Sequence, residues 1–152
     1  MSVASGPSSA ATFYHVTVAV FDLDEAIQFF GVLGFDVIKT VRISGATMDA
    51  YMGIPGMEAD HVTLAIPDAE PHQEVQLLHF HKPEQLVDRS SGNLAGTGFN
   101  HVCFRVDDLD ATVAGFEAAG FPTRNQPMDF HDRKLVFLVG PANTVVELAQ
   151  WH

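Results

Sequence analysis

The chain contains one stretch of its own sequence twice. The 22 residues from Tyr14, YHVTVAVFDLDEAIQFFGVLGF, align without a gap with the 22 residues from Asn100, NHVCFRVDDLDATVAGFEAAGF, and nine aligned positions are identical. Chance matching at that level is improbable, so the match indicates an internal duplication. The chain is therefore expected to fold as two similar modules.

Each copy reads as a strand followed by a helix. Asp22 and Asp108 suit N-caps, because an aspartate oxygen accepts hydrogen bonds from the free N–H groups of a first helical turn. Apolar residues then recur at helical spacing until Gly34 and Gly120, which suit left-handed C-caps. The alternating residues before each cap are expected to form strands, at residues 15–20 and 101–106.

The later segments give each module the order βαβββ, which predicts an α+β fold. In the second module the strand after the helix is expected at Phe121–Arg124, and KLVFLVG and TVVELAQ supply two more. The insertion ISGATMDAYMGIPGME, found in the first module alone, is expected to form a short helix near Met48–Met52 and a flap over a pocket. The expected parts are a disordered tail (1–12), a first module (13–81), a linker (82–98) and a second module (99–152), all within one compact domain.

Composition and charge exclude several partner classes. The 8 basic and 19 acidic residues give a net charge of -11, which repels nucleic acid and anionic membranes. The single cysteine, Cys103, excludes an intrachain disulfide framework and indicates a reducing compartment. No signal peptide or membrane span is apparent, so a cytoplasmic protein is expected.

Four polar residues occupy matched places in the two modules. His15 and His101 hold the same position on equivalent strands, and the closing strands align Gln76 with Glu147. If the modules close face to face, these four side chains converge. Two imidazole nitrogens, an amide oxygen and a carboxylate oxygen suit one divalent ion such as Co, Mn, Ni, Zn or Fe. The sequence therefore predicts a metal-dependent enzyme with a small-molecule substrate.

The duplicated openings, H-V-x-x-x-V-x-D-L-D, and the two V-[QE]-L closings resemble the vicinal oxygen chelate superfamily. That group includes glyoxalase I, methylmalonyl-CoA epimerase, extradiol dioxygenases and bleomycin-resistance proteins. The resemblance implies two βαβββ modules forming a cupped, incomplete β-barrel. It also implies that His15, Gln76, His101 and Glu147 are metal ligands, a set similar to that of the epimerase branch.

The resemblance further implies an isomerase, epimerase or lyase that stabilises an enolate-like intermediate. A second acid or base is expected just before the third strand, within GMEADHV, where Glu58, Asp60 and His61 are all candidates. Glu147 is the other candidate for moving the proton. Cys103 and Arg105 share the face of His101 and are expected to look toward the cavity.

Two other functions remain open at this point. Ferrous iron held by two histidines and a carboxylate would support a dioxygenase, although Gln76 as a fourth ligand argues against this. Alternatively, the protein would bind a small molecule or drug in its cupped sheet without catalysing a reaction. A homodimer is expected because each cupped sheet exposes edges that a partner would cover.

Overall fold

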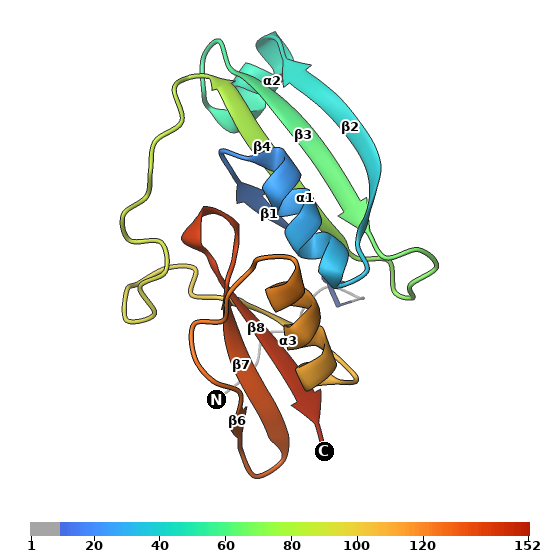
Figure 1. The fold of residues 1–152 in the computed structure, drawn as a ribbon. Helices are drawn as coiled ribbons and strands as arrows, with labels where there is room; N and C mark the ends of the chain where they lie inside the picture. Colours follow the sequence, from blue (N-terminus) through green and yellow to red (C-terminus); the bar gives the residue numbers. More distant parts are fainter. Residues whose placement is uncertain (1–9) are drawn as a thin grey trace, which may run out of the picture.

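The structure, a computed structural model, describes residues 10–152. The expected tail at residues 1–12 lies largely outside these residues. The described chain forms two four-stranded mixed sheets, one for each module (Figure 1). The first has the order β1-β4-β3-β2 and the second β5-β8-β7-β6, so in both sheets the opening strand runs parallel to the closing one.

The strands of the first sheet are β1 (His15–Ala19), β2 (Asp36–Ser44), β3 (Glu58–Ala65) and β4 (Glu74–Lys82). Those of the second are β5 (Val102–Arg105), β6 (Met128–Asp129), β7 (Arg133–Val139) and β8 (Val145–Trp151). The helices are α1 (Leu23–Val32), α2 (Ala46–Met52), α3 (Leu109–Ala118) and a 3-10 turn, η1 (Pro141–Asn143). The predicted α+β class is confirmed, and α2 lies where a short helix was expected.

The two long helices begin and end as their sequences predict. Asp22 accepts a hydrogen bond from the Glu25 backbone N–H at 3.0 Å, and Asp108 accepts one from Ala111 at the same distance. After each helix a glycine adopts a positive φ, 95° at Gly34 and 88° at Gly120. A side chain at either glycine would strain this turn, which directs the chain back toward its sheet.

Helices α1 and α3 pack against each other and join the two modules through one core. The Phe29 ring lies 4.8 Å from the Phe116 ring and 5.3 Å from the Phe121 ring, measured between centroids. Phe35 and Phe104, also from different modules, lie 5.7 Å apart. These contacts cross from one module to the other, so the two modules share one hydrophobic core.

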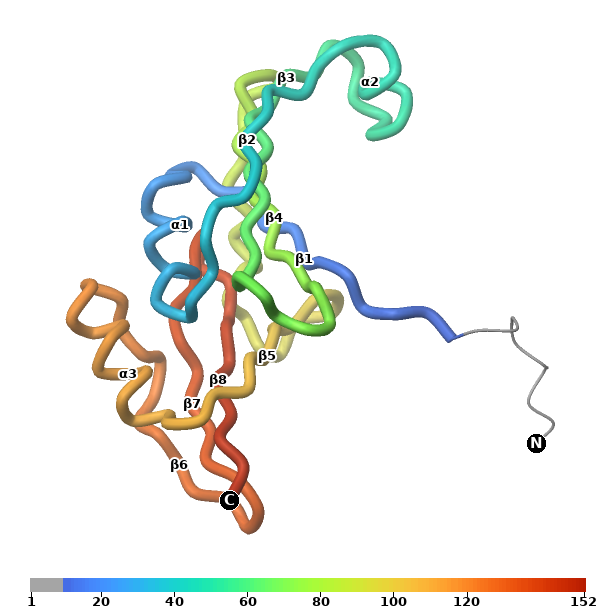
Figure 2. The backbone as a smooth tube through the Cα atoms, turned by 90° about the vertical axis from the view of Figure 1, so that its right-hand side faces the viewer, coloured from blue at the N-terminus to red at the C-terminus, as the bar shows by residue number. Residues whose placement is uncertain are grey.

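The packing of the helices gives each sheet a covered face and an open face. Figure 2 shows α1 and α3 on the same side of the two sheets, which follow one another along the molecule. Val16 and Val102 pack toward the helices and the core. Because strand side chains alternate, His15 and Cys103 point to the opposite side. We call that side, turned away from α1 and α3, the open face.

The strand expected at Phe121–Arg124 is not present. Thr123 makes only an isolated bridge to Leu138, and the edge of the second sheet is instead the two-residue strand β6. Pro122 lacks an N–H group, so it cannot complete a regular ladder with β7. Its carbonyl accepts from Val139, and Arg124 donates to Phe137, which leaves the segment beside β7 without forming a strand.

The helices of residues 10–152 include none with the length and apolar character needed to span a membrane.

We predict that the shared aromatic core makes unfolding cooperative across both modules. Phe116 is fully buried, and Phe116→Ala should lower the free energy of unfolding by about 3 to 5 kcal/mol, because the lost ring leaves a cavity. Urea denaturation followed by circular dichroism measures this. Tyr51→Ala is the control, since Tyr51 is 84% exposed. Two separate transitions, only one of them shifted by the mutation, would contradict a shared core.

Candidate metal centre

In the second module the structure brings His101 and Glu147 together on the open face. The His101 Nε2 and Glu147 Oε1 atoms lie 3.5 Å apart, and the side chains are 33% and 16% exposed. Two donors about 2.1 Å from a shared ion stand roughly 3.0 to 3.5 Å from each other. Phe137 packs edge-on against the imidazole, with 5.3 Å between ring centroids. The pair thus has the separation that a shared ion requires.

A chain of hydrogen bonds fixes which nitrogen of His101 faces Glu147. The Asn100 amide nitrogen donates to the Leu94 backbone carbonyl at 2.8 Å, so its oxygen must point the other way. That oxygen lies 2.7 Å from His101 Nδ1, and it can only accept a proton donated by Nδ1. In neutral His101 the Nε2 atom therefore carries the lone pair, as a metal ligand must.

In the first module Gln76 lies at the position that Glu147 holds in the second. Gln76 is the Cα partner of Thr17 and Glu147 is the partner of Cys103, two residues after His15 and His101 respectively. The Gln76 oxygen lies 3.0 Å from His61 Nε2 on the neighbouring strand. The structure thus places His61, a candidate acid or base, on the open face beside a candidate ligand.

The two halves of the predicted site stay apart within one chain. In residues 10–152 the structure holds no cluster of three or more His, Cys, Asp or Glu side chains that would surround a metal ion. His15 and His61 therefore do not join His101 and Glu147. The face-to-face closure that would make them converge does not occur within the described part of the chain, because the sheets lie beside one another over a common pair of helices.

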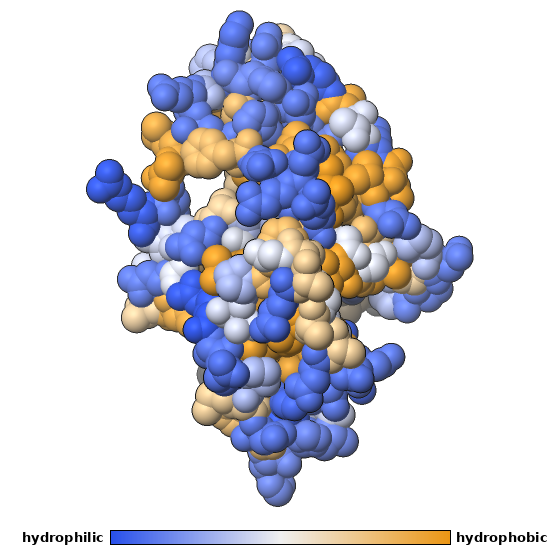
Figure 3. Space-filling view, viewed as in Figure 1, coloured by the Kyte–Doolittle hydropathy of each residue, from blue (hydrophilic) through white to orange (hydrophobic). Residues whose placement is uncertain are grey.

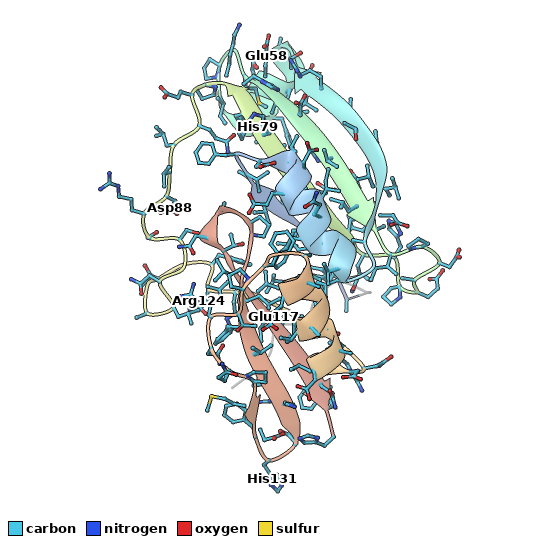
Figure 4. All side chains as sticks on the ribbon, viewed as in Figure 1. Glu58, His79, Asp88, Glu117, Arg124 and His131 are labelled. Atoms are coloured by element: carbon cyan, nitrogen blue, oxygen red, sulfur yellow. The ribbon has the colours of Figure 1, made fainter. Side chains whose placement is uncertain are left out.

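The other two candidate bases lie away from the ligand positions. Glu58 begins β3 at one end of the molecule, where its carboxylate is 3.9 Å from Lys82 (Figure 4). The Asp60 carboxylate forms hydrogen-bonded pairs with Arg42 at 2.7 Å and with His81 at 2.8 Å. These hydrogen bonds, that of His81 first, hold the Asp60 pKa below its usual value. Asp60 alternates with His61 along β3 and so faces the helix side.

Cys103 and Arg105 lie on the open face, as the strand pattern predicts. Both line a cavity of about 500 Å³ between the modules, to which the first module contributes Glu74 and Phe35. A larger cavity, of about 720 Å³, lies between the modules and the linker, where Figure 3 shows a hollow bordered by apolar residues. A small substrate would fit in either space.

Sequence reasoning missed two residues that shape these pairs, Asn100 and Glu74. Asn100 precedes the duplicated histidine, but its first-module counterpart is Tyr14, so the duplication did not mark it. Glu74 is 8% exposed, and its carboxylate bonds the Gln76 amide nitrogen at 2.9 Å. An acidic residue two positions before Gln76, on the same strand face, was the one available signal.

Two modules of this topology, each presenting a histidine and an oxygen donor on one face, define a glyoxalase-like fold. Residues 14–137 match the family described as the Glyoxalase/Bleomycin resistance protein/Dioxygenase superfamily. The chain belongs to this superfamily, and the resemblance noted from the sequence is confirmed.

The chain is similar to known glyoxalase proteins, at low sequence identity. Lactoylglutathione lyase of Schizosaccharomyces pombe is 27% identical over 142 residues, which are 91% of this chain and 44% of that protein. The chain thus spans less than half the length of that relative. A glyoxalase family protein from Bacillus cereus has the same fold, with a TM-score of 0.86, 21% identity and coverage of 97% and 99% of the two chains. Glyoxalase I of Leishmania major has a TM-score of 0.62 and 19% identity, covering 93% and 87%.

We predict that Cys103 is unreactive despite its exposed position. Partial desolvation of the sulfur, followed by the adjacent Glu147 carboxylate, raises the pKa of the Cys103 thiol to about 12 from 9.0. At pH 8 the thiolate fraction is then about a thousandfold lower than for an ordinary thiol, so alkylation by iodoacetamide should be correspondingly slow. Glu147→Gln should accelerate it, and the unfolded chain should react at the ordinary rate. Fast alkylation of the folded protein would contradict this environment.

Proposed function

We propose that this protein is a divalent-metal-dependent enzyme of the isomerase, epimerase or lyase type. Its substrate is a small molecule with two neighbouring oxygens. The observation that carries the proposal is the pair of His101 and Glu147, 3.5 Å apart on the open face, with His15 and Gln76 in the equivalent positions. This donor set suits a borderline ion such as Mn, Fe, Co, Ni or Zn.

The four residues would hold the ion through two imidazole nitrogens, the Gln76 amide oxygen and a Glu147 oxygen. When bound, such an ion polarises a substrate carbonyl and makes the adjacent C–H more acidic. His15 and His101 would bind as neutral imidazoles. The hydrogen bond from His101 Nδ1 to Asn100 supports this, because it leaves Nε2 free to act as the ligand.

His61 and Glu147 are our candidates for moving the substrate proton. His61 Nε2 donates to the Gln76 oxygen at 3.0 Å, so His61 lies beside any substrate held at that residue, and its Nδ1 atom keeps the lone pair that can accept a proton. An imidazole can both accept and return a proton, as an isomerisation or epimerisation requires. We prefer His61 to Glu58, since Glu58 lies near Lys82 at the far end of β3.

A second copy of the chain would complete the site. Each chain presents one histidine and one oxygen donor from each module, and these two pairs do not meet in residues 10–152. If two open faces meet, the first-module pair of one copy can face the second-module pair of the other. Exposed apolar side chains support such contact, among them Phe13, 58% exposed, and Phe99, 73% exposed.

We expect the metal-free protein to bind a divalent ion, measured by titration calorimetry and by elemental analysis after dialysis. His101→Ala should weaken binding at least 100-fold, because it removes an imidazole ligand. His131→Ala is the control, since His131 lies in the turn between β6 and β7 at the end of the molecule (Figure 4). Folded protein that binds none of these ions would refute the proposal.

Mixing two inactive variants tests whether the site forms between copies. His15→Ala and His101→Ala each damage every site when alone. In a mixed dimer whose sites form between chains, one site has both altered ligands and the other has neither. Co-refolding equal amounts should then restore about a quarter of the wild-type sites, whereas sites within single chains would give no recovery.

The substrate search should begin with lactoylglutathione, because the relative from Schizosaccharomyces pombe is a lactoylglutathione lyase. Two outcomes would favour other functions. Oxygen uptake that requires ferrous iron would indicate a dioxygenase. Tight binding of a small molecule that survives both a chelator and His101→Ala would indicate a binding protein without catalysis.

A further inference from the structure

Glu74 is the one buried carboxylate among residues 10–152, with 8% of its surface exposed. It lies on β4 as the Cα partner of His15, two residues before Gln76 and on the same face of the sheet. A buried carboxylate is costly unless other groups compensate its charge. Its presence beside two candidate ligands therefore requires an explanation.

Three donors surround this carboxylate. The Glu74 Oε2 atom lies 2.8 Å from His72 Nε2 and 3.2 Å from the Tyr14 hydroxyl, and Oε1 lies 2.9 Å from Gln76 Nε2. The His72 hydrogen bond, followed by those of Gln76 and Tyr14, lowers the Glu74 pKa against the opposing effect of burial.

The hydrogen bond between the Gln76 amide nitrogen and Glu74 Oε1 fixes the orientation of the Gln76 amide, because that nitrogen can only donate. The amide nitrogen must face Glu74, because the opposite orientation would set two oxygen acceptors against each other. The Gln76 oxygen consequently points away from Glu74, toward His61 Nε2 at 3.0 Å. This oxygen is the atom that a metal ion would require from Gln76.

The two modules differ at these two positions. The register pairs Val16 with Val75 in the first module and Val102 with Val146 in the second, so Val145 is the counterpart of Glu74. Val145 is 2% exposed and carries no charge. The second module thus has a carboxylate at the ligand position and a valine beside it. The first module has an amide at the ligand position and a carboxylate beside it.

We propose that Glu74 is a positioning residue, which holds the Gln76 amide so that its oxygen, and not its nitrogen, is presented for the metal. The inference rests on the proposed function for its metal.

The test replaces Glu74 by the residue of the second module, Glu74→Val. In the metal-free protein, the side-chain NH2 signals of Gln76 should move and exchange faster with solvent, since their acceptor is lost. Divalent-ion affinity by calorimetry should fall about 10- to 100-fold, the range typical for partners of metal ligands. The exposed Glu84 provides the matched control, because Glu84→Val removes the same charge far from Gln76 and should leave both measurements unchanged.

A double variant separates positioning from general damage. Glu74→Val with Gln76→Glu recreates the arrangement of Val145 and Glu147, and it should recover affinity relative to Glu74→Val alone. Unchanged affinity and unchanged Gln76 signals in Glu74→Val would overturn the inference, as would a double variant no better than the single one. Absence of metal binding by the wild-type protein would instead refute the proposed function, while the metal-free NH2 signals would still decide whether Glu74 orients Gln76.

Discussion

The contact between α1 and α3 controls the arrangement of both sheets. Phe29 and Phe116 lie in the middle of this contact, and each is fully buried. Since each helix also covers its own sheet, the two sheets must turn the same face toward the helices and the other face outward. All the candidate ligands are then displayed on one open surface. The chemistry proposed for the chain depends on this packing, although none of the core residues takes part in it.

Because side chains alternate along a strand, that packing decides which side chains face the core and which face outward. Val16 and Val102 enter the core, and the residues before and after them face outward. The same rule separates His61 from Asp60 on β3 and assigns only His61 to the face of Gln76. Because the module is duplicated, the same positions face outward in both copies. The copies have nevertheless diverged in where they carry charge, since the first has Gln76 with Glu74 and the second has Glu147 with Val145.

Much of this could be predicted from the sequence, and the exceptions have physical causes. The caps at Asp22 and Asp108 and the end at Gly34 depend on neighbouring residues only, so pattern reasoning found them. The strand expected at Phe121–Arg124 failed because Pro122 removes a donor that a ladder with β7 needs. Glu74 accepts a hydrogen bond from Tyr14, 60 residues away in sequence, and no local pattern reveals this contact.

The sequence by itself determined that the chain has two equivalent modules and that His15 corresponds to His101 and Gln76 to Glu147. Such relations follow from repeats and from a strand period of two residues, both of which are local. The tertiary structure decided which of these residues meet. It placed His101 beside Glu147 and His61 beside Gln76, and it kept the two groups apart. Distances between strands and modules are set by long-range packing of the aromatic core, and that packing is fixed only when the whole chain has folded.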